Sequence, residues 1–171
     1  FEYYFKEKQR LIRKNRTSIA VLNNEESKED LEGLSHDIFT HFGLGCRNVT
    51  KLYLPINYDL DLVFNALFHY KEVANHNKYA NNYDYNKAVY LLNQVDLIEN
   101  GFLLLKEDQG FHSPVGVLFY EFYNNLEEVN TILEKNKDSI QCIVSNEKLN
   151  GTIQFGKAQS PELWDYADGI D

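Results

Sequence analysis

The chain has 171 residues, of which 43% are hydrophobic and 14% aromatic, a composition that excludes a disordered protein and suits a domain with its own core. Seventeen Lys and Arg against 26 Asp and Glu give a formal net charge of −9, so a nucleic-acid-binding protein is not expected. Apolar runs such as residues 115–120 are too short to cross a bilayer, and no transmembrane segment is expected.

The chain starts with Phe1 and carries no secretion signal, which predicts a piece of a longer protein. Its two cysteines are too few for a disulfide framework, so a reducing, cytoplasmic location is expected. No repeat or low-complexity linker divides the sequence, and residues 1–171 are therefore expected to form a single domain.

The first elements alternate between strand and helix. Residues 18–22 (SIAVL) are apolar and partly β-branched, which is typical of a buried strand. Ser27 with Asp30 suits the start of a helix, and Gly43 suits its end. Between them the apolar residues recur at helical spacing, namely Leu31, Leu34, Ile38, Phe39 and Phe42. Residues 51–54 (KLYL) predict a second strand that ends at Pro55.

The remaining elements continue this alternation. Helical spacing recurs in residues 60–68 and 126–133, and strands are expected at residues 102–105, 115–122, 139–144 and 152–155. Residues 74–86, rich in Asn and Tyr, show no clear period and are expected to form a loop. Strands separated by single helices predict a layered α/β fold.

Cys46 is the candidate nucleophile. It lies in the segment GLGCRN between a predicted helix and a predicted strand, where Gly43 and Gly45 allow a sharp turn and close approach of a substrate. Backbone N–H groups in such a turn can stabilise an oxyanion, and Arg47 would favour the thiolate. The alternative is a small buried side chain, which is the role predicted for Cys142 within the apolar strand SIQCIVS.

Other motifs carry little chemistry. His36 and His41 lie on one predicted helix at a spacing unlike that of a paired metal site, and no metal site is predicted. Any histidine of the chain could serve as a base for Cys46, because partners in such sites meet in space. Residues 151–158 come close to a P-loop pattern, but Ala158 replaces the Ser or Thr that would bind magnesium.

The order of these pieces resembles the catalytic half of the aldehyde dehydrogenase superfamily: SIAVL, an acidic helix, GLGCRN around Cys46, and then VTKLYLP. The later runs SPVGVLFYEFYNNLEEVNTILEKN and SIQCIVS resemble the strands and helix that follow in that superfamily. Within it, the sequence is most similar to acyl-CoA reductases of the bacterial bioluminescence (LuxC) type, especially Bacteroidetes-like members. That likeness is carried by FGKAQSPELWDYADGID, NKYANNYDYNKAVYLLN and GFLLLKE.

The resemblance implies an aldehyde-dehydrogenase-like α/β catalytic domain, with a mostly parallel sheet flanked by helices. It would form the C-terminal part of a longer, self-associating reductase whose nucleotide-binding half lies upstream. Cys46 would attack the thioester of a long-chain acyl-CoA or acyl-protein donor, with its own N–H helping to hold the oxyanion. NADPH would then reduce the acyl-enzyme to a fatty aldehyde, so this piece alone is expected to be inactive.

The sequence also departs from the superfamily pattern. Hydrolytic members carry a general-base glutamate upstream of the cysteine, and the corresponding residue here is Ile12. The superfamily uses the glutamate of an ExFGP segment on the cofactor ribose, but this chain has Gln109 in a segment that ends at Pro114. No cofactor-binding residue is therefore assigned. A cysteine-dependent acyltransferase or thioesterase, and a non-catalytic interaction domain on the same scaffold, are the alternative functions.

Overall fold

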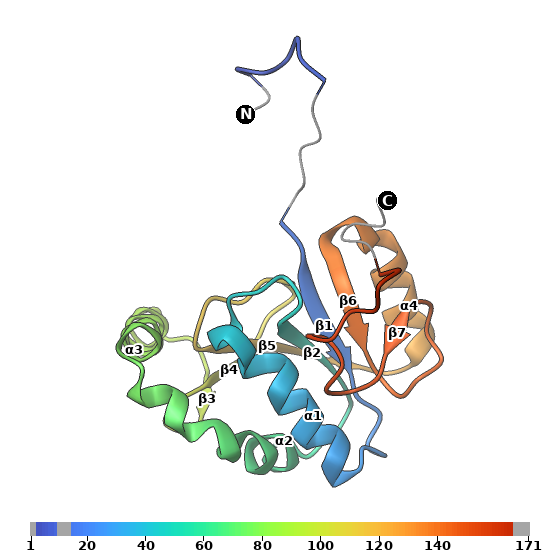
Figure 1. The fold of residues 1–171 in the computed structure, drawn as a ribbon. Coiled ribbons are helices and arrows are strands. Elements are labelled where there is room, and N and C mark those ends of the chain that lie inside the picture. Colours follow the sequence, from blue (N-terminus) through green and yellow to red (C-terminus); the bar gives the residue numbers. More distant parts are fainter. Residues whose placement is uncertain (1–2, 10–14, 166–171) are drawn as a thin grey trace.

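The computed structural model describes residues 3–9 and 15–165, and within them a single seven-stranded sheet carries helices on both faces (Figure 1). The elements in chain order are β1 (Thr17–Val21), α1 (Lys28–Phe39), the 3₁₀ turn η1 (Thr40–Gly43), β2 (Val49–Pro55), α2 (Leu60–Leu67), the 3₁₀ helix η2 (Phe68–Asn75), α3 (Asn77–Leu92), β3 (Ile98–Glu99), β4 (Leu104–Glu107), β5 (Val117–Tyr123), α4 (Leu126–Lys135), η3 (Lys137–Ser139), β6 (Ile140–Val144) and β7 (Thr152–Ile153).

The strands lie in the order β3-β4-β5-β2-β1-β6-β7, and every neighbouring pair is parallel except the antiparallel pair β3 and β4. The predicted α/β fold with a mostly parallel sheet is thus confirmed. Strand β1 is buried along its whole length between β2 and β6. Its residues alternate between the two faces, with Ala20, and Leu22 just after the strand, in the core beneath α1, and Ile19 and Val21 in the core beneath α4.

Helix α1 begins as predicted, because the Ser27 Oγ accepts the Asp30 N–H at 3.1 Å while the Ser27 N–H donates to the Asp30 carboxylate at 3.0 Å. It ends at Phe39, earlier than the sequence predicts. His41, Phe42 and Gly43 follow with φ of 54°, 60° and 73°, three consecutive left-handed residues. Such backbone cannot continue a right-handed helix, so the chain leaves α1 before the expected stop.

The predicted loop at residues 74–86 is wrong, since most of it belongs to α3. Tyr79 and Tyr83, one turn apart, are buried against the sheet, and their hydroxyls donate to the Phe102 carbonyl at 2.9 Å and to a Glu99 oxygen at 2.6 Å. A Cβ added to Gly116 would lie 3.0 Å from the Tyr83 Cα, so α3 packs closely on the chain that enters β5.

The other predicted elements are confirmed with shifted ends. Strand β4 begins at Leu104, because Phe102 and Leu103 are buried without joining the ladder. The short, exposed strand β3 at the sheet edge is not predicted from the sequence. In the part of the chain that the structure describes, no helix is both long and apolar enough to cross a membrane.

Candidate functional site

Cys46 lies in a tight turn between η1 and β2, formed by Gly45, Cys46, Arg47 and Asn48 and called here the Cys46 turn. The Asn48 N–H donates to the Gly45 carbonyl at 3.0 Å and closes it. Cys46 is exposed, whereas Cys142 is buried. The predicted glycine-assisted turn is therefore present, and it presents the Cys46 side chain to solvent.

Asn48 anchors this turn to the end of α1. Its side chain is wholly buried, its Oδ1 accepts the Gly45 N–H at 2.8 Å, and its Nδ2 donates to the carbonyls of Asp37 and Thr40 at 3.0 and 2.8 Å. The carbonyls at the end of a helix need such donors, because they have no partner within the helix. This role of Asn48 was not predicted from the sequence. The feature that could have indicated it is a single amide residue directly before an apolar strand.

Arg47 ties the Cys46 turn to residues 155–165, called here the C-terminal segment. Its Nε donates to the Ala158 carbonyl, and its Nη2 pairs with Asp165 Oδ2 at 2.8 Å. Arg47 was expected to favour the Cys46 thiolate. Its guanidinium instead binds a part of the chain that is distant in sequence. A charged, two-point attachment of this kind also restricts the turn itself.

Asp37, on α1, holds the same segment from the other side and was not predicted. Its carboxylate is wholly buried and accepts the N–H groups of Gly156 at 2.7 Å and Ala158 at 3.0 Å. Burial raises the pKa of Asp37 to about 6, against the opposing effect of these two hydrogen bonds and of His36. Close packing supports the attachment, since a Cβ on Gly33 would lie 2.8 Å from the Gly156 nitrogen.

The two cysteines share one neighbourhood. Ser18, wholly buried in β1, donates from its Oγ to the Cys46 carbonyl at 3.0 Å. Burial raises the pKa of the Cys142 thiol, Arg47 and the Ser18 hydroxyl act to lower it, and Asp165 and Cys46 act to raise it. Cys142 is buried, as predicted.

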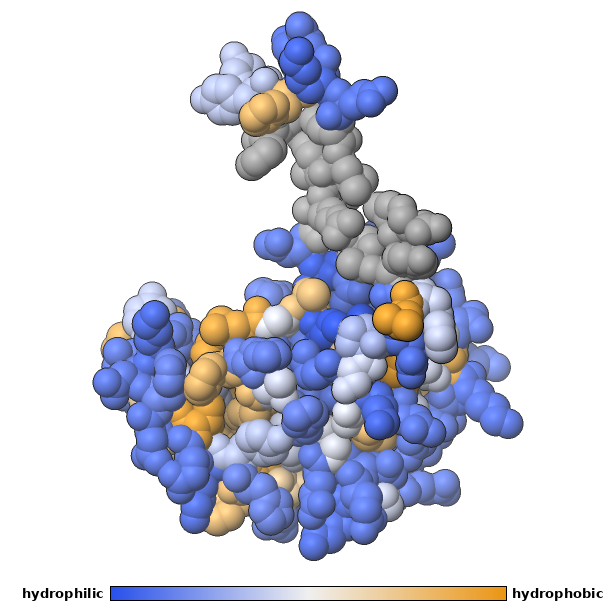
Figure 2. Space-filling view, in the orientation of Figure 1, coloured by the Kyte–Doolittle hydropathy of each residue, from blue (hydrophilic) through white to orange (hydrophobic). Residues whose placement is uncertain are grey.

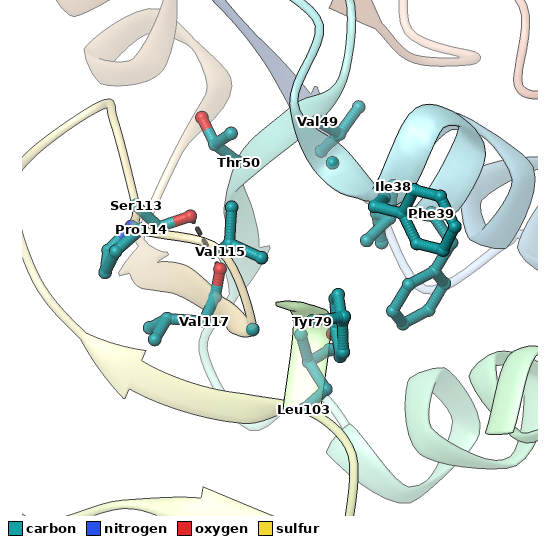
Figure 3. Close-up of a pocket in the computed structure, with 13 residues that line it drawn as sticks. Ile38, Phe39, Val49, Thr50, Tyr79, Leu103, Ser113, Pro114, Val115 and Val117 are labelled. Carbon is teal, nitrogen blue, oxygen red and sulfur yellow. Dashed lines mark hydrogen bonds between the residues drawn. The ribbon is translucent and has the colours of Figure 1, made fainter. Parts of the chain in front are cut away.

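A small apolar pocket of about 20 Å³ adjoins η1 and has room for roughly one water molecule (Figure 3). Figure 3 shows the side chains of Ile38 and Phe39 from α1 on one side and Val115, from the segment that enters β5, on the other. Phe42, also in its lining, stacks on His76 with ring centroids 4.1 Å apart. The pocket is too small for a cofactor, and it places apolar surface beside the loop that carries Cys46.

The histidines make other contacts. His36 Nδ1 is 3.1 Å from the Tyr70 hydroxyl, and His69 is 3.8 Å from a carboxylate oxygen of Glu32. Within residues 3–9 and 15–165, no hydrogen bond joins a histidine to Cys46, and no group of three or more His, Cys, Asp or Glu is placed to hold a metal ion. The P-loop-like stretch contains strand β7, as expected of a chance match.

Asp108 and Gln109, in the segment that corresponds to ExFGP, do not fit the ribose contact of a nicotinamide cofactor. Gln109 is exposed, and the neighbouring carboxylate of Asp108 is already engaged. Although its burial opposes this, hydrogen bonds from Lys106 and the Gly110 N–H hold the pKa of Asp108 below its ordinary value. Neither side chain offers a free carboxylate to a ribose. Ile12, the other departure from the superfamily pattern, lies outside the described residues.

No protein-family model matches the chain, and no curated protein matches it in sequence. Among solved structures, the substrate-bound state of Staphylococcus aureus AldH, an aldehyde dehydrogenase, matches with a TM-score of 0.54 and 10% identity. The match covers 80% of this chain and 35% of that chain, so the present chain spans about a third of that protein. Together with the mostly parallel sheet, this match shows that the chain has an aldehyde-dehydrogenase-like α/β fold.

Proposed function

We propose that this chain is the cysteine-bearing part of an acyl-CoA reductase that forms a fatty aldehyde, with Cys46 as its nucleophile. The observation that carries the proposal is the exposed Cys46 in a turn held by buried side chains on an aldehyde-dehydrogenase-like fold. Cys142 is not proposed as the nucleophile, because it is buried within a strand.

The first half-reaction needs only this chain and the acyl donor. The Cys46 sulfur attacks the thioester carbonyl carbon, a new C–S bond forms, and the carbonyl electron pair moves onto oxygen. Collapse of that oxyanion breaks the bond to the sulfur of coenzyme A, which leaves as the thiol and takes the proton that Cys46 lost. The acyl group is then joined to Cys46 as a thioester, and the Cys46 N–H is the proposed donor to the oxyanion.

The surface around the Cys46 turn supports an aliphatic acyl group. Leu44, directly before the turn, is 71% exposed and Phe42 is 38% exposed. Figure 2 shows hydrophobic side chains over the loop between α1 and β2 and in the hollow beside α3. Exposed apolar side chains beside a nucleophile favour a substrate with apolar surface to bury. A long-chain acyl-CoA or an acyl-protein donor would provide that surface.

When bound, NADPH would supply the hydride that reduces the acyl-enzyme to aldehyde. We propose that NADPH binds mainly in the upstream half of the whole protein, and the lack of a free carboxylate at Gln109 and Asp108 supports this proposal. A homo-oligomer and a cytoplasmic location belong to the same proposal.

The test is the intact mass of the whole protein after incubation with a long-chain acyl-CoA and no NADPH, followed by peptide mapping. An acyl adduct on Cys46 is expected, absent from Cys46→Ser and retained in Cys142→Ser, and NADPH should remove it with release of aldehyde. Hydrolysis of the adduct without NADPH would instead indicate a thioesterase. A folded protein that binds acyl-CoA but forms no adduct would contradict covalent catalysis and favour an interaction domain.

A further inference from the structure

Ser18 is a polar side chain next to the apolar residues 19–21 of strand β1. It lies in β1 with none of its surface exposed, and its neighbours Ile19 and Ala20 are equally buried. A buried hydroxyl is unfavourable unless it forms a hydrogen bond. The Ser18 Oγ satisfies this requirement by donating to the carbonyl oxygen of Cys46 at 3.0 Å.

This hydrogen bond acts on the peptide of the candidate nucleophile itself. Asn48 holds the Gly45 amide, and the Arg47 side chain holds the C-terminal segment, but Ser18 holds the carbonyl of Cys46. A trans peptide is planar, with its C=O and N–H pointing in opposite directions. Because the Cys46 carbonyl points toward Ser18, the Arg47 N–H of the same peptide points away from β1.

The N–H groups of the turn are available for a ligand. Among the residues that the structure describes, neither the Cys46 N–H nor the Arg47 N–H has a hydrogen-bond acceptor, whereas the N–H groups of Gly45 and Asn48 are both bonded. Two consecutive unbonded N–H groups next to an exposed thiol are suitable donors to an oxyanion that forms on a carbonyl attacked by that thiol.

We propose that Ser18 is a positioning residue for the reaction at Cys46. Its hydroxyl sets the rotation of the Cys46–Arg47 peptide, and so directs the N–H group of Arg47, next to the unbonded N–H of Cys46, toward the oxygen of the acyl group under attack. This inference rests on the proposed function in one respect, namely that the group attacked by Cys46 is a carbonyl.

Two reactions of the same thiol separate this role from simple support of the fold. Attack on an ester carbonyl places negative charge on oxygen and depends on oriented N–H donors. Alkylation by iodoacetamide displaces iodide at a saturated carbon and forms no oxyanion. If Ser18 orients the Arg47 N–H, its loss should slow acylation of Cys46 and leave alkylation of the same sulfur nearly unchanged.

Ser145 provides a matched control. It is also buried, and its Oγ donates to the main-chain carbonyl of Val21 at 2.7 Å, at the other end of β1 from Ser18, and accepts the Glu147 N–H at 3.0 Å. Ser18→Ala and Ser145→Ala therefore each remove a buried hydroxyl that donates to a main-chain carbonyl at one end of β1, and Ser145→Ala also removes the acceptor of the Glu147 N–H. Only Ser18→Ala acts on Cys46.

The experiment compares both variants with the unchanged whole protein, using p-nitrophenyl acetate as an acyl donor that needs no coenzyme A site, and iodoacetamide as the alkylating agent. Mass spectrometry follows each adduct on Cys46. Ser18→Ala should slow acylation by roughly 10- to 100-fold, as small displacements in a reacting group do, with alkylation changed less than about twofold. Ser145→Ala should leave the ratio of the two rates unchanged.

Equal slowing of both reactions in Ser18→Ala, or the same change of ratio in Ser145→Ala, would overturn the inference. If Ser18→Ala does not fold, Ser18→Thr is used instead, because it keeps the hydroxyl. Its ratio of acylation rate to alkylation rate should equal that of the unchanged protein, and a lower ratio would contradict the proposal. Acylation by p-nitrophenyl acetate but not by acyl-CoA would reject the proposed function and still decide the role of Ser18. Alkylation without any acylation would reject both.

Discussion

A carboxylate oxygen of Asp37 accepts the N–H of Ala158 at 3.0 Å, although 121 residues separate them in sequence. The carbonyl of the same Ala158 accepts a hydrogen bond from Arg47, the residue next to Cys46. One residue of the C-terminal segment therefore joins α1 to the Cys46 turn. The position of the candidate nucleophile thus depends on contacts between three parts of the chain that are far apart in sequence.

Asp37 should make stability fall as the pH rises. Burial raises its pKa from 3.8 to about 6, so between these values the folded protein keeps a proton that the unfolded chain has lost. Replacement by Asn removes this titration. The free energy of unfolding of the unchanged protein, minus that of Asp37→Asn, should fall by about 2 kcal/mol from pH 4 to pH 7. Urea denaturation at a series of pH values measures it. A flat difference would show that Asp37 ionises as it does in water, and a rising one that its pKa is lowered in the folded protein.

Gly33→Ala should destabilise the protein, against the usual preference of helices for alanine. In an open helix this change would stabilise by up to about 1 kcal/mol. Here the new Cβ would lie 2.8 Å from the Gly156 nitrogen and 2.9 Å from the Phe155 carbonyl carbon, both backbone atoms that cannot easily move. A loss of about 1 to 3 kcal/mol is expected in chemical denaturation. Glu32→Ala, at an exposed position of α1, should change the stability by less than about 0.5 kcal/mol. A stabilised Gly33→Ala variant would mean that the C-terminal segment does not pack on α1.

Arg47→Ala should loosen the C-terminal segment before it affects the rest of the fold. The variant loses the hydrogen bond to Ala158 and the ion pair with Asp165. Hydrogen bonds from a charged donor contribute about 1.5 to 3 kcal/mol, so the N–H groups of Gly156 and Ala158 should exchange with solvent roughly tenfold or more faster. Hydrogen-exchange mass spectrometry reports this. Lys28→Ala, which removes an exposed charge from α1, should leave the same peptides unchanged.

The buried pair of Lys51 and Glu121 should respond unequally to loss of either partner. The Lys51 side chain is wholly buried and lies 2.8 Å from Glu121 Oε2, whereas Glu121 is 27% exposed. Glu121→Gln leaves a buried ammonium group without its counter-charge and should cost about 3 kcal/mol. Lys51→Met leaves a carboxylate that can reach water, and should cost about 1 kcal/mol or less.

The same pair gives a pH test in the alkaline range. Burial lowers the pKa of Lys51 although Glu121 opposes this, so below pH 10.5 the unfolded chain binds the proton more strongly than the folded protein. Stability should therefore rise with pH as that limit is approached, and the rise should be absent from Lys51→Met. If Lys51→Met lowers the free energy of unfolding more than Glu121→Gln does, the Lys51 ammonium group is better solvated than the structure indicates.

Local chemistry accounts for the elements that were predicted correctly. The capping box at Ser27 and the apolar spacing of α1 depend on residues within a few positions of one another, so the sequence displays them directly. Helix α3 was missed because its buried face consists of tyrosines and an amide, which hydropathy patterns score as nearly polar. Tyr79, Tyr83, Asn86 and Tyr90 nevertheless recur at helical spacing, and attention to aromatic side chains would have found them.

Part of the candidate site could likewise be predicted from the sequence, and part of it could not. The turn around Cys46 could be predicted, because glycine and a short polar segment between helix and strand are local signals. Asp37 and Ser18 could not, since each looks like an ordinary polar residue until the fold brings Ala158 or Cys46 against it. The role of a buried polar group depends on hydrogen-bond partners that only the tertiary structure brings close to it.

The attachment of Arg47 also sets the order in which a growing chain can complete this region. β1, α1 and β2 are consecutive, and their contacts can form soon after the ribosome releases them. The Arg47 guanidinium can bind the Ala158 carbonyl only after Ala158, 111 residues later in the chain, has been synthesised. During synthesis the candidate nucleophile therefore lies on a turn that Asn48 can already close, but that is not yet attached to the C-terminal segment. A ribosome stalled before Ala158 would hold a chain whose Cys46 turn can form without this attachment.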